Sequence, residues 1–201
     1  MTLSSAYADP VLSAQSTFRS IMDAMARPGN VVSLREPLAA PAPLTRGSAA
    51  VALTLCDQDT SVWLDPVLAA SGEAAYWLRF HTGAPIVPEP SQASFAFLAD
   101  PAKAPPFDAF ALGTAEYPDR SATLVFQVDS LARGQAFTLT GPGIKGRKTL
   151  RAEPLPADLP QRLTANRALF PCGVDLLLVT DAAVAALPRS VMLVEGGLTC
   201  T

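Results

Sequence analysis

The stretch FRSIMDAMARPG, at residues 18–29, ends the first regular element that the sequence predicts. Its final proline and glycine stop a helix, and Arg27 just before them suits the negative end of a helix dipole. Upstream, Asp9 can accept hydrogen bonds from the free amides of a first turn, and Pro10 fits the first helical position. Between these signals, apolar residues recur at intervals of three and four, which predicts an amphipathic surface helix with an apolar stripe: Val11, Ala14, Phe18, Ile21, Met22 and Met25.

The length and composition of the chain predict one domain, over residues 1–201, with a sizeable core. Hydrophobic residues make up 49% of the chain and charged residues 16%, against roughly 25% charged residues in an ordinary protein. Two explanations stay open for this apolar composition. The interior is rich in alanine, or an apolar surface is covered by another subunit.

Charge and cysteine content exclude several classes of protein. A net charge of −3 and a pI of about 5.1 argue against a nucleic-acid binder. The one basic cluster, at 145–151, is interpreted as the solvated edge of a hairpin. No apolar run is long enough to span a membrane, and the first ten residues lack the features of a signal peptide. We therefore expect a cytoplasmic protein with reduced thiols at Cys56, Cys172 and Cys200.

Nineteen prolines divide the chain into short elements. Helices are expected at 45–57 and 159–169, and 73–80 is either a short helix or the entry to a strand. Residues 99–107 are expected to form a loop, 141–146 a turn, and 147–151 an antiparallel return. Strands are expected at 61–64, 94–98, 123–129, 136–140, 175–180 and 191–195. This mixture, without strict βαβ alternation, predicts an α/β fold with a mixed sheet covered by helices.

His81 is the only histidine, and it offers two interpretations. An imidazole can act as a general base near neutral pH if a carboxylate orients it, and Asp57 or Asp59 could do so. Alternatively, His81 is a hydrogen-bonded structural residue. A nucleophilic pair with Cys172 is a further candidate. One histidine and isolated cysteines do not supply a metal site of the usual spacing.

Seven segments, in order along nearly the whole chain, carry a family resemblance. They are FRSIMDAMARPG (18–29), LTLCDQDTSVWL (53–64), LRFHTGAP (78–85), ATLVFQVDSL (122–131), LTGPGI (139–144), FPCGVDLLL (170–178) and LPR (187–189). Together they resemble the family of the H subunit of the bacterial carbon–phosphorus lyase system, PhnH. One such segment would carry little weight, because Gly-Pro-Gly is ordinary turn chemistry. Seven in order make chance a poor explanation.

The resemblance implies a fold similar to the large domain of pyridoxal-phosphate-dependent transferases, without the cofactor. The surroundings of Lys103, Lys145 and Lys148 also speak against a Schiff base. The family resemblance further implies an accessory, noncatalytic subunit that works with the G, I and J subunits. Their early product, from ATP and an alkylphosphonate, is a ribose 1-alkylphosphonate 5-triphosphate. The isolated family member is a homodimer, and the complex replaces that contact with the G subunit.

Three arginines, Arg19, Arg79 and Arg189, match the family's FR, RFHT and PR motifs. A guanidinium suits phosphonate or triphosphate oxygens, and equally suits salt bridges across a subunit interface. Two alternatives to the accessory subunit therefore remain. One is a phosphonate- or nucleotide-binding subunit that uses these arginines and His81. The other is a stand-alone acid–base enzyme that uses His81 and a carboxylate.

Overall fold

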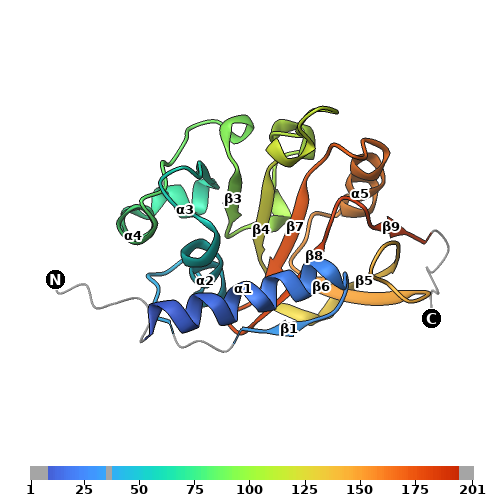
Figure 1. Cartoon of the computed structure of the whole chain (residues 1–201), viewed down its shortest axis with the longest axis horizontal. Coiled ribbons are helices and arrows are strands. Elements are labelled where there is room, and N and C mark those ends of the chain that lie inside the picture. The colour runs from blue at the N-terminus through green and yellow to red at the C-terminus, as the bar shows by residue number, and fades with distance from the viewer. Residues whose placement is uncertain (1–8, 35–37, 195–201) are drawn as a thin grey trace.

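The computed structural model describes residues 9–34 and 38–194. Its main sheet has the strand order β1-β8-β7-β4-β3-β2. The strands β2, β3, β4 and β7 run parallel, and β8 and β1 add antiparallel pairs at one side. The predicted α/β class, a mixed sheet flanked by helices, is confirmed (Figure 1). The strand bounds are β1 Val32–Ser33, β2 Val62–Leu64, β3 Phe95–Leu98, β4 Thr123–Gln127, β7 Asp175–Val179 and β8 Ala183–Leu187.

A second, antiparallel sheet has the order β6-β5-β9. Its strands are β5 Ser130–Thr140, β6 Lys148–Glu153 and β9 Met192–Leu193. The predicted turn and antiparallel return are confirmed. The strand β5 begins six residues before the expected 136, and its pairing with β6 shifts register between Ser130 and Gln135. Glu195, at the end of the last predicted strand, and Cys200 lie outside the described residues.

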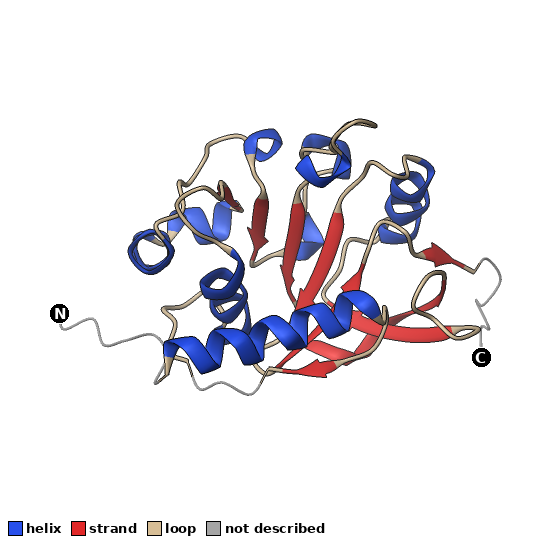
Figure 2. Cartoon of the chain, viewed as in Figure 1, coloured by secondary structure: helices blue, strands red, loops and turns tan. Residues whose placement is uncertain are grey.

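Five α-helices surround the main sheet in the described part of the chain (Figure 2). Four of them begin at a side-chain cap, and the predicted cap at Asp9 is confirmed by its bonds to the amides of Val11 and Leu12. Residues 73–80 belong to a helix, which settles the alternative left open above. The bounds are α1 Pro10–Ala26, α2 Arg46–Leu55, α3 Pro66–Ala70, α4 Gly72–Thr82 and α5 Leu159–Ala168.

Short 3₁₀ helices fill several connections. The predicted loop at 99–107 is only partly right, because it contains a 3₁₀ turn and runs into another. Prolines at the first positions of three of these turns explain the pattern, since proline fixes a helical φ and needs no amide partner there. The four are η1 Pro90–Gln92, η2 Pro101–Lys103, η3 Phe107–Ala109 and η4 Pro118–Arg120.

The core lies on both faces of the main sheet because successive strand residues point to opposite sides. In β7, Leu177 packs in the cluster that contains residues of α1, α2, α3 and α4. Its neighbours Leu176 and Leu178 pack on the other face, with residues of α5, β5 and β6. Burial on both faces makes the parallel strands continuous apolar runs such as LLLV.

The helix α1 divides its predicted apolar stripe between the core and the surface. Its buried residues are mostly small or polar: Ser13, Thr17, Ile21 and Ala24. Its exposed residues include large apolar ones: Val11, Phe18 and Met22. The small side chains suit close packing against α2, whose buried residues are also small over 47–50. The stripe is therefore a core face only in part, and its remainder is an apolar flank open to solvent.

Candidate functional site

A groove of about 710 Å³ lies between α1 and β1. Figure 1 shows these two elements along the lower edge of the molecule. The Ser20 hydroxyl of α1 donates to the carbonyl of Ser33 in β1 at 3.1 Å, so the two walls are joined. The volume falls within the roughly 300–1,000 Å³ typical of ligand sites. The lining residues are Leu12, Gln15, Ser16, Arg19, Ser20, Asp23, Arg27, Asn30, Val31, Val32, Ser33 and Lys148.

The groove carries an excess of positive charge. Arg19, Arg27 and Lys148 line it, whereas Asp23 is its one carboxylate. Asp23 forms an ion pair with Arg27. Arg19 and Lys148 are exposed and make no ion pair with any residue in the described ranges. The groove thus has two cations without a protein counter-charge.

A second hollow, of about 360 Å³, continues the groove along β6. The two share Val31 and Lys148 in their linings, and the second extends to Arg151. A guanidinium nitrogen of Arg151, Nη1, donates to the carbonyl of Gly134 at 3.0 Å, which fixes one end of the side chain. Part of the basic cluster that the sequence assigned to a solvated hairpin edge therefore faces a surface groove.

Two of the ordered sequence segments meet at the end of α1. Gly29 has a φ of +78°, and a methyl group there would lie 2.9 Å from Cγ of Lys148. Gly143 has a φ of +79°, and a methyl group there would lie 2.1 Å from the carbonyl oxygen of Ala26. Both positions combine a left-handed backbone with a close approach, which only glycine accommodates without strain. These contacts bring residues 18–29 and 139–144 together and set the stem of Lys148 against the helix end.

Arg189, a predicted ligand-binding residue, is the centre of a hydrogen-bonded hub. Its Nε and Nη2 donate to the carboxylate of Asp175, and Nη2 also donates to the hydroxyl of Ser121. Its Nη1 donates to the carbonyls of Pro118, at 2.7 Å, and Pro171, at 3.3 Å. A guanidinium has five N–H donors, so every one has a protein partner. A ligand at Arg189 would have to displace one of them.

His81 lies near the end of α4, half-buried against aromatic rings. Its ring centroid is 4.5 Å from that of Trp77 and 5.1 Å from that of Phe80. Burial lowers its pKa below the ordinary value of 6.5, because the charged form loses hydration. No hydrogen bond or ion pair joins it to Asp57, Asp59 or Cys172 within the described ranges. The structure therefore does not assemble the acid–base or nucleophilic pairs considered from the sequence.

Asp57 is committed to a local turn. Its carboxylate oxygen Oδ1 accepts from the Thr60 hydroxyl at 2.7 Å and from the Asp59 amide at 3.0 Å. The bond from Thr60, and to a lesser extent the bond from Asp59, lowers the pKa of Asp57 because it stabilises the charged carboxylate. Both aspartates are exposed, and the loop that holds them passes close to Gly83, just after His81.

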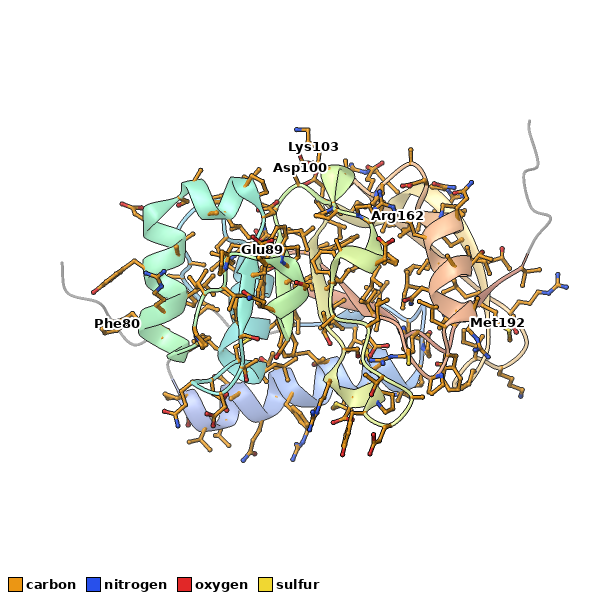
Figure 3. All side chains as sticks on the ribbon, turned by 90° about the horizontal axis from the view of Figure 1, so that it is seen from above. Phe80, Glu89, Asp100, Lys103, Arg162 and Met192 are labelled. Atoms are coloured by element: carbon orange, nitrogen blue, oxygen red, sulfur yellow. The ribbon has the colours of Figure 1, made fainter. Side chains whose placement is uncertain are left out.

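The three predicted arginines do not form one site. Arg19 lies on α1 and Arg189 follows β8, whereas Arg79 is exposed on α4 beside Tyr76 and Phe80, whose stacked rings are 6.1 Å apart. Seen from above, Phe80 lies at the outer edge of the molecule (Figure 3). Of the three, Arg19 has both a groove and a guanidinium without an ion-pair partner in the described residues.

Cys56 and Lys103 offer little chemistry. Cys56 is buried, which raises the pKa of its thiol to about 12 and keeps it protonated. Lys103 pairs with Asp100 at 2.8 Å, and all three lysines are exposed.

Within the described ranges, no three His, Cys, Asp or Glu side chains gather into a metal site. In the same part of the chain, no helix has the length and hydropathy needed to cross a membrane.

Sequence reasoning missed two features of this surface. The exposed flank of α1 was hidden because spacing marks an apolar stripe but not which part of it meets the core. The groove was hidden because Lys148 is more than a hundred residues from Arg19, and only the packing of Gly29 and Gly143 joins them. The positive-φ glycines themselves, in RPG and GPG, were the available signal.

Comparisons with known proteins agree on one family. The family described as "Bacterial phosphonate metabolism protein (PhnH)" matches residues 5–194. A protein of Rhizobium meliloti (strain 1021), named alpha-D-ribose 1-methylphosphonate 5-triphosphate synthase subunit PhnH, is 50% identical over 190 residues, or 94% of each chain. A protein of Stutzerimonas stutzeri, provisionally named as the C-P lyase subunit protein HtxG, is 31% identical over 179 residues, covering 88% of this chain and 83% of that protein. The resemblance carried by seven ordered segments is confirmed, and the chain belongs to the PhnH family of bacterial phosphonate metabolism proteins.

Proposed function

We propose that this chain is an accessory subunit of the carbon–phosphorus lyase machinery. In this role it supports the formation of ribose 1-alkylphosphonate 5-triphosphate from ATP and an alkylphosphonate, and it is not catalytic alone. The relative from Rhizobium meliloti, 50% identical over nearly the whole chain, is named as a subunit of such a synthase. The relative from Stutzerimonas stutzeri is also named as a lyase subunit.

The structural observation that supports this role is the exposed apolar flank of α1, made of Val11, Phe18 and Met22. Their exposed fractions are 65%, 47% and 47%, although each is a large apolar side chain. Neighbouring apolar residues exposed on one helix side mark a surface that a partner covers. A subunit that works inside a complex needs such a surface.

The partners we propose are the G, I and J subunits of the same system, in the cytoplasm. In isolation the chain forms a homodimer, and the G subunit takes the place of the second copy in the complex. One apolar surface then serves two partners in turn, and mass action decides which is bound. The flank of α1 is the surface that we assign to both contacts.

Reconstitution tests this function. The chain is purified alone and together with the G, I and J subunits, and adenine release from ATP with methylphosphonate is measured with and without it. We expect the chain to enter the complex, to raise the yield of product and to show no turnover alone. Failure to enter the complex would overturn the accessory role. Turnover by the purified chain would favour the stand-alone enzyme, and His81→Ala would then abolish it.

The same resemblance leads us to propose that the main sheet is similar to that of the large domain of pyridoxal-phosphate-dependent transferases, without the cofactor. The exposure of Lys103, Lys145 and Lys148 supports this, because a Schiff-base lysine is held in a shielded pocket. The test is the visible spectrum after pyridoxal phosphate is added. A Schiff-base band that disappears when one lysine is replaced would contradict the proposal.

Ligand binding is a second candidate function, in which phosphonate or nucleotide is held by Arg19, Arg79, Arg189 and His81. The position of Arg19 in the α1–β1 groove favours it. The hub around Arg189 supports a structural role for that residue instead. Saturable binding of methylphosphonate or ATP to the purified chain, without turnover, is the expected result. If neither ligand binds, ligand binding is contradicted and the accessory role is the remaining candidate function.

A further inference from the structure

We infer that the joined hollows between α1 and β6 bind a linear polyphosphate chain through Arg19, Arg27, Lys148 and Arg151. This inference rests on the proposed ligand-binding role and assigns it a place and a ligand chemistry. Arg27, Lys148 and Arg151 are added to the residues considered so far, and Arg79 and Arg189 are left out. The carboxylate of Asp23 is the only negative side chain that lines either hollow.

The charge balance of the surface favours an anion. The whole chain carries a net charge of −3, yet four cations and one carboxylate line the joined hollows. Asp23 is engaged by Arg27, so Arg19 and Lys148 keep their full charge for a ligand. Phosphate oxygens are the natural partners, because charge-assisted bonds to a guanidinium or ammonium are stronger than neutral ones.

The spacing of the cations favours a chain of phosphates over a single one. Arg27 caps the C-terminal end of α1, eight residues after Arg19, which is about 12 Å along a helix axis. Lys148 lines both hollows and Arg151 lines the second, so cations continue beyond the end of α1. A single phosphate cannot contact cations distributed over that length. A linear polyphosphate can meet several of them at once.

Three of these side chains are already held in place. Lys148 packs its stem against the glycine at 29, where any larger residue would collide with it. Arg151 is fixed by its bond to the carbonyl of Gly134, and Arg27 by its pair with Asp23. Side chains that are held before binding lose less conformational entropy when the ligand arrives.

The lining also indicates which part of a ligand is recognised. No aromatic side chain lines either hollow. Proteins that grip bases or single-stranded nucleic acid combine a basic groove with aromatic surfaces for stacking. A groove without such rings recognises the phosphate chain itself. Inorganic tripolyphosphate should therefore bind about as well as a nucleoside triphosphate, and adenosine should not bind.

Calorimetric titration of the full chain at low ionic strength tests the inference, with inorganic tripolyphosphate, ATP, adenosine and a single-stranded oligonucleotide as probes. Each of Arg19→Gln and Lys148→Gln should weaken tripolyphosphate binding about tenfold, or by about 1.4 kcal/mol, because it removes one charge-assisted hydrogen bond to a phosphate oxygen. The matched control is Lys103→Gln, which also removes one exposed cation and lies away from α1 (Figure 3). Added salt should weaken binding in the wild type.

The outcomes separate the inference from the accessory role. If the groove variants and the control bind tripolyphosphate with equal affinity, the inference that the groove binds polyphosphate is wrong. Binding of adenosine, or a preference for the oligonucleotide, also contradicts it. If the chain enters the complex but does not bind tripolyphosphate, only the inference of polyphosphate binding is overturned, and the accessory role stands. A chain that binds tripolyphosphate at Arg19 but does not enter the complex supports the groove and overturns the accessory role. Circular dichroism and the unfolding midpoint of each variant confirm that it is folded.

Discussion

Arg189 and Asp175 are linked through both main chain and side chain. The amide of Arg189 donates to the Asp175 carboxylate at 2.8 Å, and its Nη2 donates to the same group at 2.5 Å. Both side chains are only 15% exposed. The pair ties the end of β8 to the beginning of β7, and Nη1 of Arg189 binds the carbonyls of Pro118, at the start of η4, and Pro171. Two of the ordered sequence segments, 170–178 and 187–189, are thus joined by one guanidinium.

Replacing this arginine should lower the stability of the fold. Removing one partner of a largely buried pair leaves an uncompensated charge and costs about 3–5 kcal/mol, so Arg189→Ala should lower the free energy of unfolding by that order. Arg189→Lys should recover only part of it, because an ammonium cannot reach all the acceptors at once. Urea denaturation followed by circular dichroism measures both. A fully stable Arg189→Ala chain that loses phosphonate binding would instead support the ligand-binding prediction.

The junction between α1 and the 141–146 turn offers a test of close packing. In Gly143→Ala the new methyl group would collide with the carbonyl of Ala26, in addition to the strain of a positive φ. The matched control is Gly146→Ala, where φ is also positive but no atom lies within 4 Å of the added group. We expect the first variant to unfold more easily than the second by about 1–3 kcal/mol, the usual cost of overpacking. Similar unfolding free energies would show that the turn shifts freely.

Stability should depend on pH through His81. Its pKa is lowered in the folded state, so as the pH falls below 6.5 the unfolded chain takes up a proton before the folded chain does. The free energy of unfolding should therefore fall between pH 7 and pH 5. In His81→Phe this decline should be shallower, because the titrating group is gone while a ring remains against Trp77. An unchanged pH profile in the variant would show that other groups cause the decline.

Elements whose own residues favour their structure were predictable. The helix α1 was marked by its cap and its terminating proline and glycine, and the strands TLVFQ and DLLLV by continuous apolar runs. The strand β8 was missed because its sequence, AVAAL, is mostly alanine, which favours strands weakly. It forms because β7 lies beside it and supplies its hydrogen-bond partners. That information is tertiary, so the local sequence does not contain it.

The candidate site was less predictable than the fold. The sequence marked Arg19 and Arg189 alike, as arginines in motifs. Only the structure distinguishes them. Arg189 forms hydrogen bonds with Asp175, which is fourteen residues away in the sequence, whereas Arg19 lines a groove. The side of a helix that meets solvent depends on which neighbours pack against it. The exposure of Phe18 was for that reason invisible in a spacing pattern that also contained Ile21.

Substitutions on the two sides of α1 should have opposite consequences. Ile21 is 2% exposed, so Ile21→Ala should lower the free energy of unfolding by about 2–5 kcal/mol, through lost burial and the cavity that remains. Phe18 and Met22 are about half exposed, so their replacement by serine should change stability by only about 0.5 kcal/mol. Replacing Phe18 and Met22 together should also weaken self-association, because the apolar flank loses its two largest side chains.

Size exclusion coupled to light scattering, first on the chain alone and then with the G subunit, measures this association. The wild type should be a homodimer at micromolar concentration, and the G subunit should replace one copy as the two compete for the flank. The double variant Phe18→Ser/Met22→Ser should be a folded monomer that binds the G subunit poorly. A Tyr76→Ser variant is the matched control, because it removes from α4 a large side chain that is at least as exposed. If that control lost the homodimer and the α1 variant kept it, the interface would lie on α4. A wild-type homodimer that stays intact with the G subunit bound would show that the two partners use different surfaces.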